Sequence, residues 1–270
     1  MNLIMNLFEW YLKTNIHVSI SVWSLYKITF FYINSYQNHY LDWLVFTSSF
    51  VGYNMLKYSP ILFKNKCKIL KSLEIVIFFA FVVGVFCFFK LDLLTQIIFS
   101  ICFIVVFFYS TTSIFSVFSL RSLKGLKIFI ISFVWTSVTY LSLLSQMDFK
   151  YEFTYIILGI QRFIFVFVLS IPFDIRDVNI DPPELKTIPQ TFGILKSKFL
   201  GILLLTISVL MFYFVTEIRP SYIIIETIIY IFLICLLIMC NNKKHLNFTR
   251  FWVEGLPIIW LVVLIIFARC

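Results

Sequence analysis

The chain is dominated by apolar segments close to twenty residues long, and these segments limit what it can fold into. Runs such as Ile75–Phe89 and Leu200–Phe214 carry almost no charge. A helix needs roughly 20 apolar residues to cross a bilayer, because each residue adds ~1.5 Å to its length. With 61% hydrophobic residues, 13% charged residues and a mean hydropathy of +0.98, the sequence predicts a polytopic membrane protein and excludes an ordinary soluble domain.

Nine such segments can be counted, and we expect them to form one all-α membrane domain that covers residues 1–270. The predicted spans are residues 16–34, 40–58, 70–89, 92–112, 126–145, 153–174, 198–216, 221–240 and 249–268. Residues 1–14 mix apolar side chains with polar ones, and we expect this lead-in to lie along the membrane interface.

The basic residues are distributed unequally between the loops, and this predicts the orientation. Loops after the even-numbered spans hold Lys57, Lys64, Lys66, Lys68, Lys71, Arg121, Lys124, Lys127, Arg176, Lys186, Lys196, Lys198, Lys243, Lys244 and Arg250, whereas the alternate loops hold Lys90, Lys150 and Arg219. By the positive-inside rule the first set is cytoplasmic, which places the N-terminus inside and the C-terminus outside. The net charge of +9 therefore reflects membrane orientation and does not indicate nucleic-acid binding.

The most unusual polar stretch is Phe173–Gly193, of sequence FDIRDVNIDPPELKTIPQTFG, on the predicted cytoplasmic side. Asp174, Asp177 and Asp181 are spaced i, i+3, i+7, so they share one face if the preceding helix continues to the prolines at 182 and 183. A helix C-terminus disfavours acids, so three of them there need a cation. Mg²⁺ suits such a site, because it binds through one or two carboxylates plus substrate phosphates.

A second interpretation of this stretch is a solvated acidic loop whose charge is neutralised locally by Arg176 and Lys186. The helical spacing and the proline pair favour the metal site over this alternative.

The stretch also resembles the second aspartate-rich motif of the UbiA superfamily of intramembrane prenyltransferases. That motif runs D-x-x-D-x-x-x-D, then a basic residue, T-[LI]-P and a glycine, and it is matched by Asp174, Asp177, Asp181, Lys186, Thr187, Ile188, Pro189 and Gly193. The resemblance implies a nine-helix UbiA-like bundle in the plasma (inner) membrane with its active site facing the cytoplasm. The implied activity is Mg²⁺-assisted transfer of an isoprenyl group from its diphosphate to a lipophilic acceptor, with an aromatic acceptor preferred.

The first aspartate-rich motif of that family, N-D-x-x-D-x-x-x-D, is degenerate here. Asn54 fits, but Met55, Tyr58 and Leu62 stand where the family has acids. One interpretation is that Lys57 takes over the neutralisation of phosphate as a point charge. The other is a span end with interfacial tyrosines and a snorkelling lysine.

The resemblance assigns further roles. Asp174, Asp177 and Asp181 are the implied catalytic and metal-binding residues, with Mg²⁺ on the first two and Asp181 binding through water or orienting Lys186. The residues expected at the substrate diphosphate are Asn54, Lys57, Arg121, Lys127 and Lys186, and those expected at the pocket are Tyr53, Tyr109 and Arg162. For Arg121 and Lys127 the alternative is ordinary positive-inside charge.

Arg162 lies midway along the sixth predicted span, roughly 18 Å from Asp174 along a helix. A charge at that depth is costly and normally faces a partner or a wet cavity. The alternatives are an ion pair with Glu226 or Glu254, or a place in the substrate pocket. Gln161 and Gln96 are expected to form hydrogen bonds between helices.

The alternative from another functional class is a non-catalytic relative of these enzymes. Such a protein would bind an isoprenoid or another lipid, or serve as a partner subunit. Loss of the first-motif acids favours it, and retention of all the second-motif acids argues against it. An ion-coupled transporter is less favoured, because no pair of Gly- or Pro-broken half-helices is evident. The sequence therefore predicts a divergent prenyltransferase that uses an isoprenyl diphosphate, a lipophilic acceptor and the lipid bilayer.

Overall fold

The computed structural model describes residues 2–33, 37–62, 68–110, 125–147, 153–215, 218–241 and 247–268. Throughout these ranges the regular structure is helical, and no strand occurs in them. The all-α class predicted from the sequence is confirmed.

The helices follow the predicted apolar segments. They are α1 (Asn2–Lys13), α2 (Ile16–Ile33), α3 (His39–Leu62), α4 (Lys68–Phe88), α5 (Leu93–Ser110), α6 (Lys127–Thr136), η3 (Ser137–Leu141), α7 (Ser142–Leu144), α8 (Phe153–Arg176), η4 (Pro183–Leu185), α9 (Ile188–Phe192), α10 (Ile194–Met211), η5 (Phe212–Phe214), α11 (Pro220–Met239), η6 (Phe248–Val253) and α12 (Leu256–Ala268). Each predicted span coincides with one helix or with a run of consecutive helical segments. The short elements η4 and α9 lie in a stretch that the sequence had assigned to a loop.

Six helical stretches in the described ranges are long and apolar enough to cross a membrane. They are Ile16–Ile33, Lys127–Leu144, Phe153–Arg176, Ile194–Phe214, Pro220–Met239 and Phe248–Phe267. Large apolar side chains such as Phe78, Leu93 and Phe199 are exposed on the outside of the bundle. Such a surface is stable against lipid and not against water, so the chain is an integral membrane protein.

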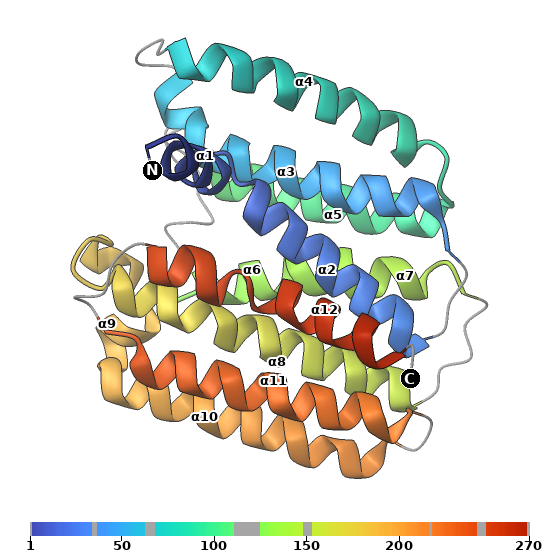
Figure 1. Ribbon diagram of the computed structural model, residues 1–270, viewed down its shortest axis with the longest axis vertical. Helices are drawn as coiled ribbons and strands as arrows, with labels where there is room; N and C mark the ends of the chain where they lie inside the picture. Colours follow the sequence, from blue (N-terminus) through green and yellow to red (C-terminus); the bar gives the residue numbers. More distant parts are fainter. Residues whose placement is uncertain are drawn as a thin grey trace.

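The helices lie side by side in a bundle, with α3, α4 and α5 on one flank and α10 and α11 on the other (Figure 1). Between the flanks, α2 packs against α3 and α12, while α8 packs against α6 and α10. Helix α9 lies at the same end of the bundle as the N-terminus (Figure 1), and we call this the α9 end. The polar residues discussed below gather there.

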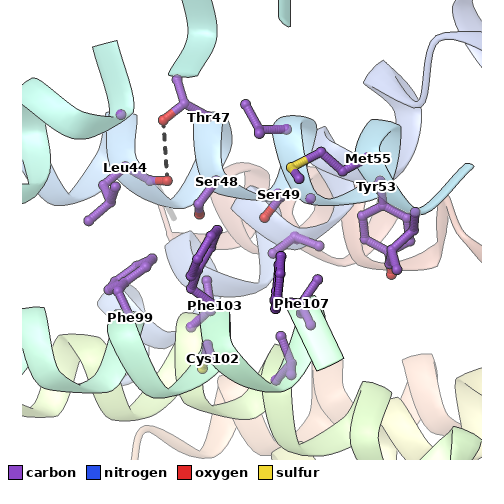
Figure 2. Close-up of a pocket in the computed structure, with 18 of the residues that line it drawn as sticks. Leu44, Thr47, Ser48, Ser49, Tyr53, Met55, Phe99, Cys102, Phe103 and Phe107 are labelled. Atoms are coloured by element: carbon purple, nitrogen blue, oxygen red, sulfur yellow. Dashed lines mark hydrogen bonds between the residues drawn. The ribbon is translucent and has the colours of Figure 1, made fainter. Parts of the chain in front are cut away.

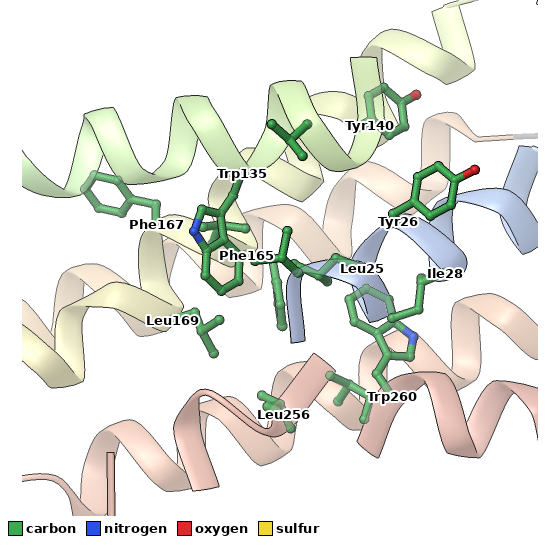
Figure 3. Packing of buried hydrophobic residues seen from close by; sticks show 14 of the residues in the cluster. Leu25, Tyr26, Ile28, Trp135, Tyr140, Phe165, Phe167, Leu169, Leu256 and Trp260 are labelled. Carbon is green, nitrogen blue, oxygen red and sulfur yellow. The ribbon is translucent and has the colours of Figure 1, made fainter. Parts of the chain in front are cut away.

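A group of buried aromatic residues joins α2, α8, α11 and α12. Figure 3 shows three of the large residues in it, Tyr26, Phe165 and Trp260. The ring of Phe165 meets Trp260 edge-on at a centroid distance of 5.1 Å and stacks on Tyr230 at 5.8 Å. Leu25 packs in the same cluster and is fully buried. Lipid tails are as apolar as these side chains, so moving the side chains out of lipid gives no hydrophobic gain. In a bilayer the helices are therefore held together by close packing of this kind.

Arg162 lies in this packed interior. Its Nη1 donates to the Leu25 carbonyl oxygen at 2.9 Å, and its guanidinium lies over the Trp260 ring at 5.4 Å. Glu226 interacts with it electrostatically and accepts a hydrogen bond from the Tyr230 hydroxyl at 2.5 Å. Glu226 is thus a charged neighbour of Arg162, but the two side chains do not form a direct ion pair, and Arg162 does not line the cavity described below.

The two glutamine predictions have different outcomes. Gln161 donates from Nε2 to the Ser208 carbonyl oxygen at 2.8 Å and so links α8 to α10, as expected. Gln96 instead donates to the Leu91 carbonyl oxygen, just before its own helix, so the expected link between helices was wrong. Gln96 lies near the start of α5, so its side chain can reach the backbone of the preceding turn. This local hydrogen bond replaces one to another helix.

Lys27 is a partly buried basic residue that the sequence had not singled out. Its Nζ lies 2.5 Å from Oδ1 of Asp42 and between 5.4 and 5.5 Å from the ring centroids of Trp23, Tyr26 and Phe30. The ion pair and the surrounding rings join α2 to α3, which explains why a lysine is tolerated within an apolar segment.

We expect Arg162→Met to lower the free energy of unfolding by about 3–5 kcal/mol, because it leaves Glu226 buried without its cation. Thermal unfolding of the detergent-purified protein measures this. The double variant Arg162→Met/Glu226→Gln should lose less stability than the two single variants summed. Lys90→Met removes an exposed charge and serves as the control, and an Arg162→Met variant as stable as this control would contradict the prediction.

Candidate functional site

The acidic stretch begins on α8, and this helix ends earlier than predicted. The helix ends at Arg176, so Asp177 and Asp181 lie in the turns that follow, where the Asp181 N–H donates to the Asp177 carbonyl oxygen at 2.8 Å. Pro182 cannot donate a backbone hydrogen bond and disfavours helical geometry at the residue before it. The expectation of one continuous helix to residue 181 was therefore wrong by about a turn.

The structure nevertheless brings Asp174 and Asp181 together through Lys127. The Lys127 Nζ lies 2.9 Å from Oδ1 of Asp174 and 2.8 Å from Oδ2 of Asp181. Asp174 is 2% exposed, whereas Lys127 retains 24% of its side-chain surface. A residue expected at the substrate diphosphate thus lies directly against two of the expected catalytic acids.

Two turns hold these three side chains in place. Gly125, at a φ of 74° that few other residues adopt, donates its N–H to the Leu185 carbonyl oxygen at 2.8 Å and so fixes the start of α6. Gln190 accepts from the Thr187 N–H at 3.0 Å and donates to the Asp181 carbonyl oxygen at 2.8 Å. The segment that follows the acids therefore folds back on them and includes the short helix α9.

Asp177 faces a different cation. Arg176 donates from Nε to Oδ1 at 2.7 Å and from Nη2 to Oδ2 at 2.6 Å, and its Nη1 donates to Oγ1 of Thr249 at 2.6 Å. Local neutralisation by Arg176, which the sequence left open for the whole stretch, is thus present for this one acid. A bidentate pair of this kind holds both side chains in a fixed orientation.

Asn54, the one residue of the first motif that fits the family, is buried in a structural contact. Its Nδ2 donates to the carbonyl oxygens of Thr14 and Phe50 at 3.0 and 2.8 Å, and its Oδ1 accepts from Nδ2 of Asn15 at 3.1 Å. Asn15 has a φ of 60° in the turn between α1 and α2. Asn54 therefore ties this turn to α3.

Lys57 contributes to the same contact. Its Nζ donates to the Lys13 carbonyl oxygen at 2.6 Å, and the Tyr58 hydroxyl donates to that oxygen at 2.8 Å. Lys57 also lies within electrostatic range of Glu254 and Arg250. These partners give Lys57 a structural role at the end of α1 that the sequence had not foreseen.

Glu254 was expected as a partner of Arg162, and this alternative was wrong. It lies instead among Lys57, Arg176 and Arg250 at the α9 end. The sequence does contain a signal for part of this arrangement, because Arg250 and Glu254 are four residues apart.

A cavity of about 530 Å³ lies between α3, α4, α5 and α6 (Figure 2). Its lining is mostly aliphatic and aromatic and includes Leu44, Thr47, Ser48, Ser49, Gly52, Tyr53, Phe99, Phe103, Phe107, Tyr109 and Trp135. The Tyr53 hydroxyl accepts a hydrogen bond from Nε1 of Trp135 at 2.7 Å. The two tyrosines expected at the pocket therefore do line a cavity, one whose size and apolar character suit a small organic ligand.

The cavity extends along α6 towards the acidic cluster. Ile130, Ile131, Val134 and Trp135 all line it, at spacings that place them on one stripe of the helix. Lys127 is one turn before Ile130, about 4.5 Å along the helix axis, at the end of the same stripe. One helix thus presents an apolar cavity wall and, at its first residue, the lysine that bridges two carboxylates.

The other predicted site residues are less informative. Lys186 is exposed and has a φ of 44°, in the turn that leads into α9. Arg121 lies outside the described residues.

The donor chemistry of the cluster can be compared with what a metal requires. Within the described ranges, no three or more His, Cys, Asp or Glu side chains gather at one point that could hold a metal ion. Asp174 and Asp181 do, however, direct oxygen atoms at one cation. Two carboxylates fit Mg²⁺, which completes its shell with water and substrate phosphate.

Comparison with known proteins identifies the fold. No protein-family model matches the sequence, and no curated protein matches it either. The structure is similar to one solved in work on digeranylgeranylglyceryl phosphate synthase in membranes, with a TM-score of 0.58, 18% sequence identity, and coverage of 94% of this chain and 92% of that chain. At this identity the likeness shows a shared fold, and that fold agrees with the one that the predicted resemblance implied.

We expect Asn54→Ala to loosen α1 from the bundle, because the turn after it loses its buried hydrogen bonds at a cost of about 1–3 kcal/mol. Limited proteolysis should then cleave residues 2–13 faster than in the wild type. Lys186→Ala, an exposed change at the same end, is the control. Equal cleavage rates in the two variants would show that Asn54 does not hold α1.

Proposed function

We propose that the protein is a membrane prenyltransferase that moves an isoprenyl group from its diphosphate to a lipophilic acceptor. The observation that carries this proposal is the stripe along α6, on which Lys127, paired with two carboxylates, lies one turn before Ile130, a residue that lines the apolar cavity. An isoprenyl diphosphate has the same two parts, a highly charged head and a long apolar tail. The fold similarity to digeranylgeranylglyceryl phosphate synthase supports the same conclusion.

The membrane arrangement is part of the proposal. We take α2, α3, α4, α5, α6–α7, α8, α10, α11 and α12 as nine spans of one membrane domain. Basic residues that the structure describes, such as Lys57, Lys127 and Arg176, lie at the α9 end, which we assign to the cytoplasmic face of the plasma membrane. The substrate head group would be bound at that face.

The head group is assigned to the cluster formed by Lys127, Asp174 and Asp181. The two carboxylates would hold Mg²⁺, and the ion would supply Lewis-acid stabilisation to the departing diphosphate. Lys127 would donate hydrogen bonds to phosphate oxygens, which carry increasing charge as the carbon–oxygen bond breaks. Asp177 takes part indirectly, because its bidentate pair with Arg176 holds the chain between the two metal-binding acids.

The tail is assigned to the cavity. Its apolar walls exclude water, which would otherwise capture the reactive allylic carbon in place of the acceptor. The rings of Tyr53, Phe103, Phe107 and Trp135 line it and can stabilise developing positive charge through their π faces. A lipophilic acceptor then forms the new bond to that carbon and releases a proton.

The primary test is a thermal-shift titration of the detergent-purified protein with farnesyl and geranylgeranyl diphosphate, with Mg²⁺ or with chelator. A ligand at 100 times its dissociation constant stabilises the folded state by about 2.7 kcal/mol. We expect a Mg²⁺-dependent shift in the wild type, its loss in Asp174→Asn, and a fall in prenyl transfer of roughly 10²–10³-fold.

Glu184→Gln is the matched control, because Glu184 is an exposed acid in the same segment. It should behave as the wild type does. Full transfer activity in Asp174→Asn would refute the assignment of the head group, and a shift that is indifferent to Mg²⁺ would remove the metal from the proposal.

A second test fills the cavity. Gly52 lines it, and a Cβ atom added there meets no other atom within 4 Å, so Gly52→Phe should fold and occupy space needed by the tail. We expect transfer from geranylgeranyl diphosphate to fall by on the order of tenfold or more and transfer from shorter diphosphates to fall less. Gly52→Ala is the control. Equal transfer by Gly52→Phe and the wild type for every chain length would place the tail elsewhere.

A further inference from the structure

We propose that Lys127 is a tethered counter-ion that makes binding of the divalent cation depend on binding of the diphosphate. This inference rests on the proposed function and concerns the regulation of the same site. Its basis is geometric, because one ammonium group already contacts both carboxylates assigned to the metal, at 2.9 and 2.8 Å.

The charges of the cluster explain the coupling. Two carboxylates and one ammonium leave a single negative charge, and Asp177 contributes none because Arg176 neutralises it. A divalent ion that entered alone would share these carboxylates with the ammonium and be repelled by it. A diphosphate brings several negative charges and provides new acceptors for the ammonium. Metal and diphosphate should therefore each favour the binding of the other.

Exposure indicates which partner moves. Asp174 is 2% exposed and Asp181 13%, whereas Lys127 is 24% exposed at the first residue of α6. A lysine has a flexible four-carbon stem and three rotatable donors, so its ammonium can turn from carboxylate to phosphate while the backbone stays in place.

Among the described residues, two other cations at the α9 end are less suited to this role. Arg176 is held by Asp177 on two atoms and by Thr249 on a third, so releasing it breaks three hydrogen bonds. Lys57 is bonded to the backbone at the end of α1. Lys127 is thus the cation whose position depends on the two metal-binding carboxylates themselves.

The test measures metal binding without turnover. Full-length protein in detergent is equilibrated with Mn²⁺, which prefers the same oxygen ligands as Mg²⁺, and the retained manganese is measured after ultrafiltration. The wild type is compared with Lys127→Met and with Lys198→Met, which removes an equal charge from a lysine that donates to the Ile238 backbone carbonyl on α11. We expect Lys127→Met to bind Mn²⁺ alone on the order of tenfold more tightly than the other two proteins.

Inorganic pyrophosphate completes the test. It should increase manganese retention by the wild type on the order of tenfold and by Lys127→Met much less. Equal affinity of the wild type and Lys127→Met for Mn²⁺ alone overturns the proposal, as does an equal gain with pyrophosphate. If loss of the ammonium destabilises Lys127→Met, Lys127→Gln keeps an amide donor towards the carboxylates and removes only the charge.

Failure of this inference can be distinguished from failure of the proposed function. Binding of farnesyl diphosphate is measured in parallel on the same proteins. Absence of binding in all of them contradicts the prenyltransferase assignment, while the comparison of manganese affinities still decides the role of Lys127.

Discussion

The ion pairs of Lys127 with Asp174 and Asp181 are the interaction on which the rest of the site depends. They join the start of α6 to the end of α8, and α6 then forms one wall of the apolar cavity. Asp174 is almost fully buried, and a buried carboxylate is stable only with a cation beside it. The cluster therefore stabilises the α9 end of the bundle and provides the charges that the proposed chemistry needs.

Much of the fold could be predicted from the sequence, because apolar segments near twenty residues have few alternatives to helices in a membrane. The placement of individual polar residues was harder to predict. Glu226 and Glu254 were equal candidates for the partner of Arg162. Almost every position in these spans is apolar, so the sequence does not show which face of each helix points into the bundle. Only the packed structure shows that Glu226 is the acid near Arg162, whereas Glu254 lies at the α9 end.

The site was predicted in part. The spacing of Asp174, Asp177 and Asp181 drew attention to the segment where Lys127 makes its ion pairs, but it could not show that the helix ends at Arg176 or that Asp177 pairs with Arg176. Asn54 matched a motif position and Lys57 was a candidate for phosphate binding, yet both contact the turn between α1 and α2. That contact joins residues about forty positions apart, which no local pattern encodes.

The proposed function places the head of one ligand at Lys127 and its tail in the cavity between α3, α4, α5 and α6. Photo-crosslinking with a farnesyl diphosphate analogue that carries a diazirine on its tail, followed by peptide mapping, measures this most directly. We expect labels on residues such as Phe103, Phe107 and Ile131, and loss of those labels when excess farnesyl diphosphate competes. Labels confined to the lipid-facing surfaces of α10 and α11, or labels that do not respond to the competitor, would contradict it.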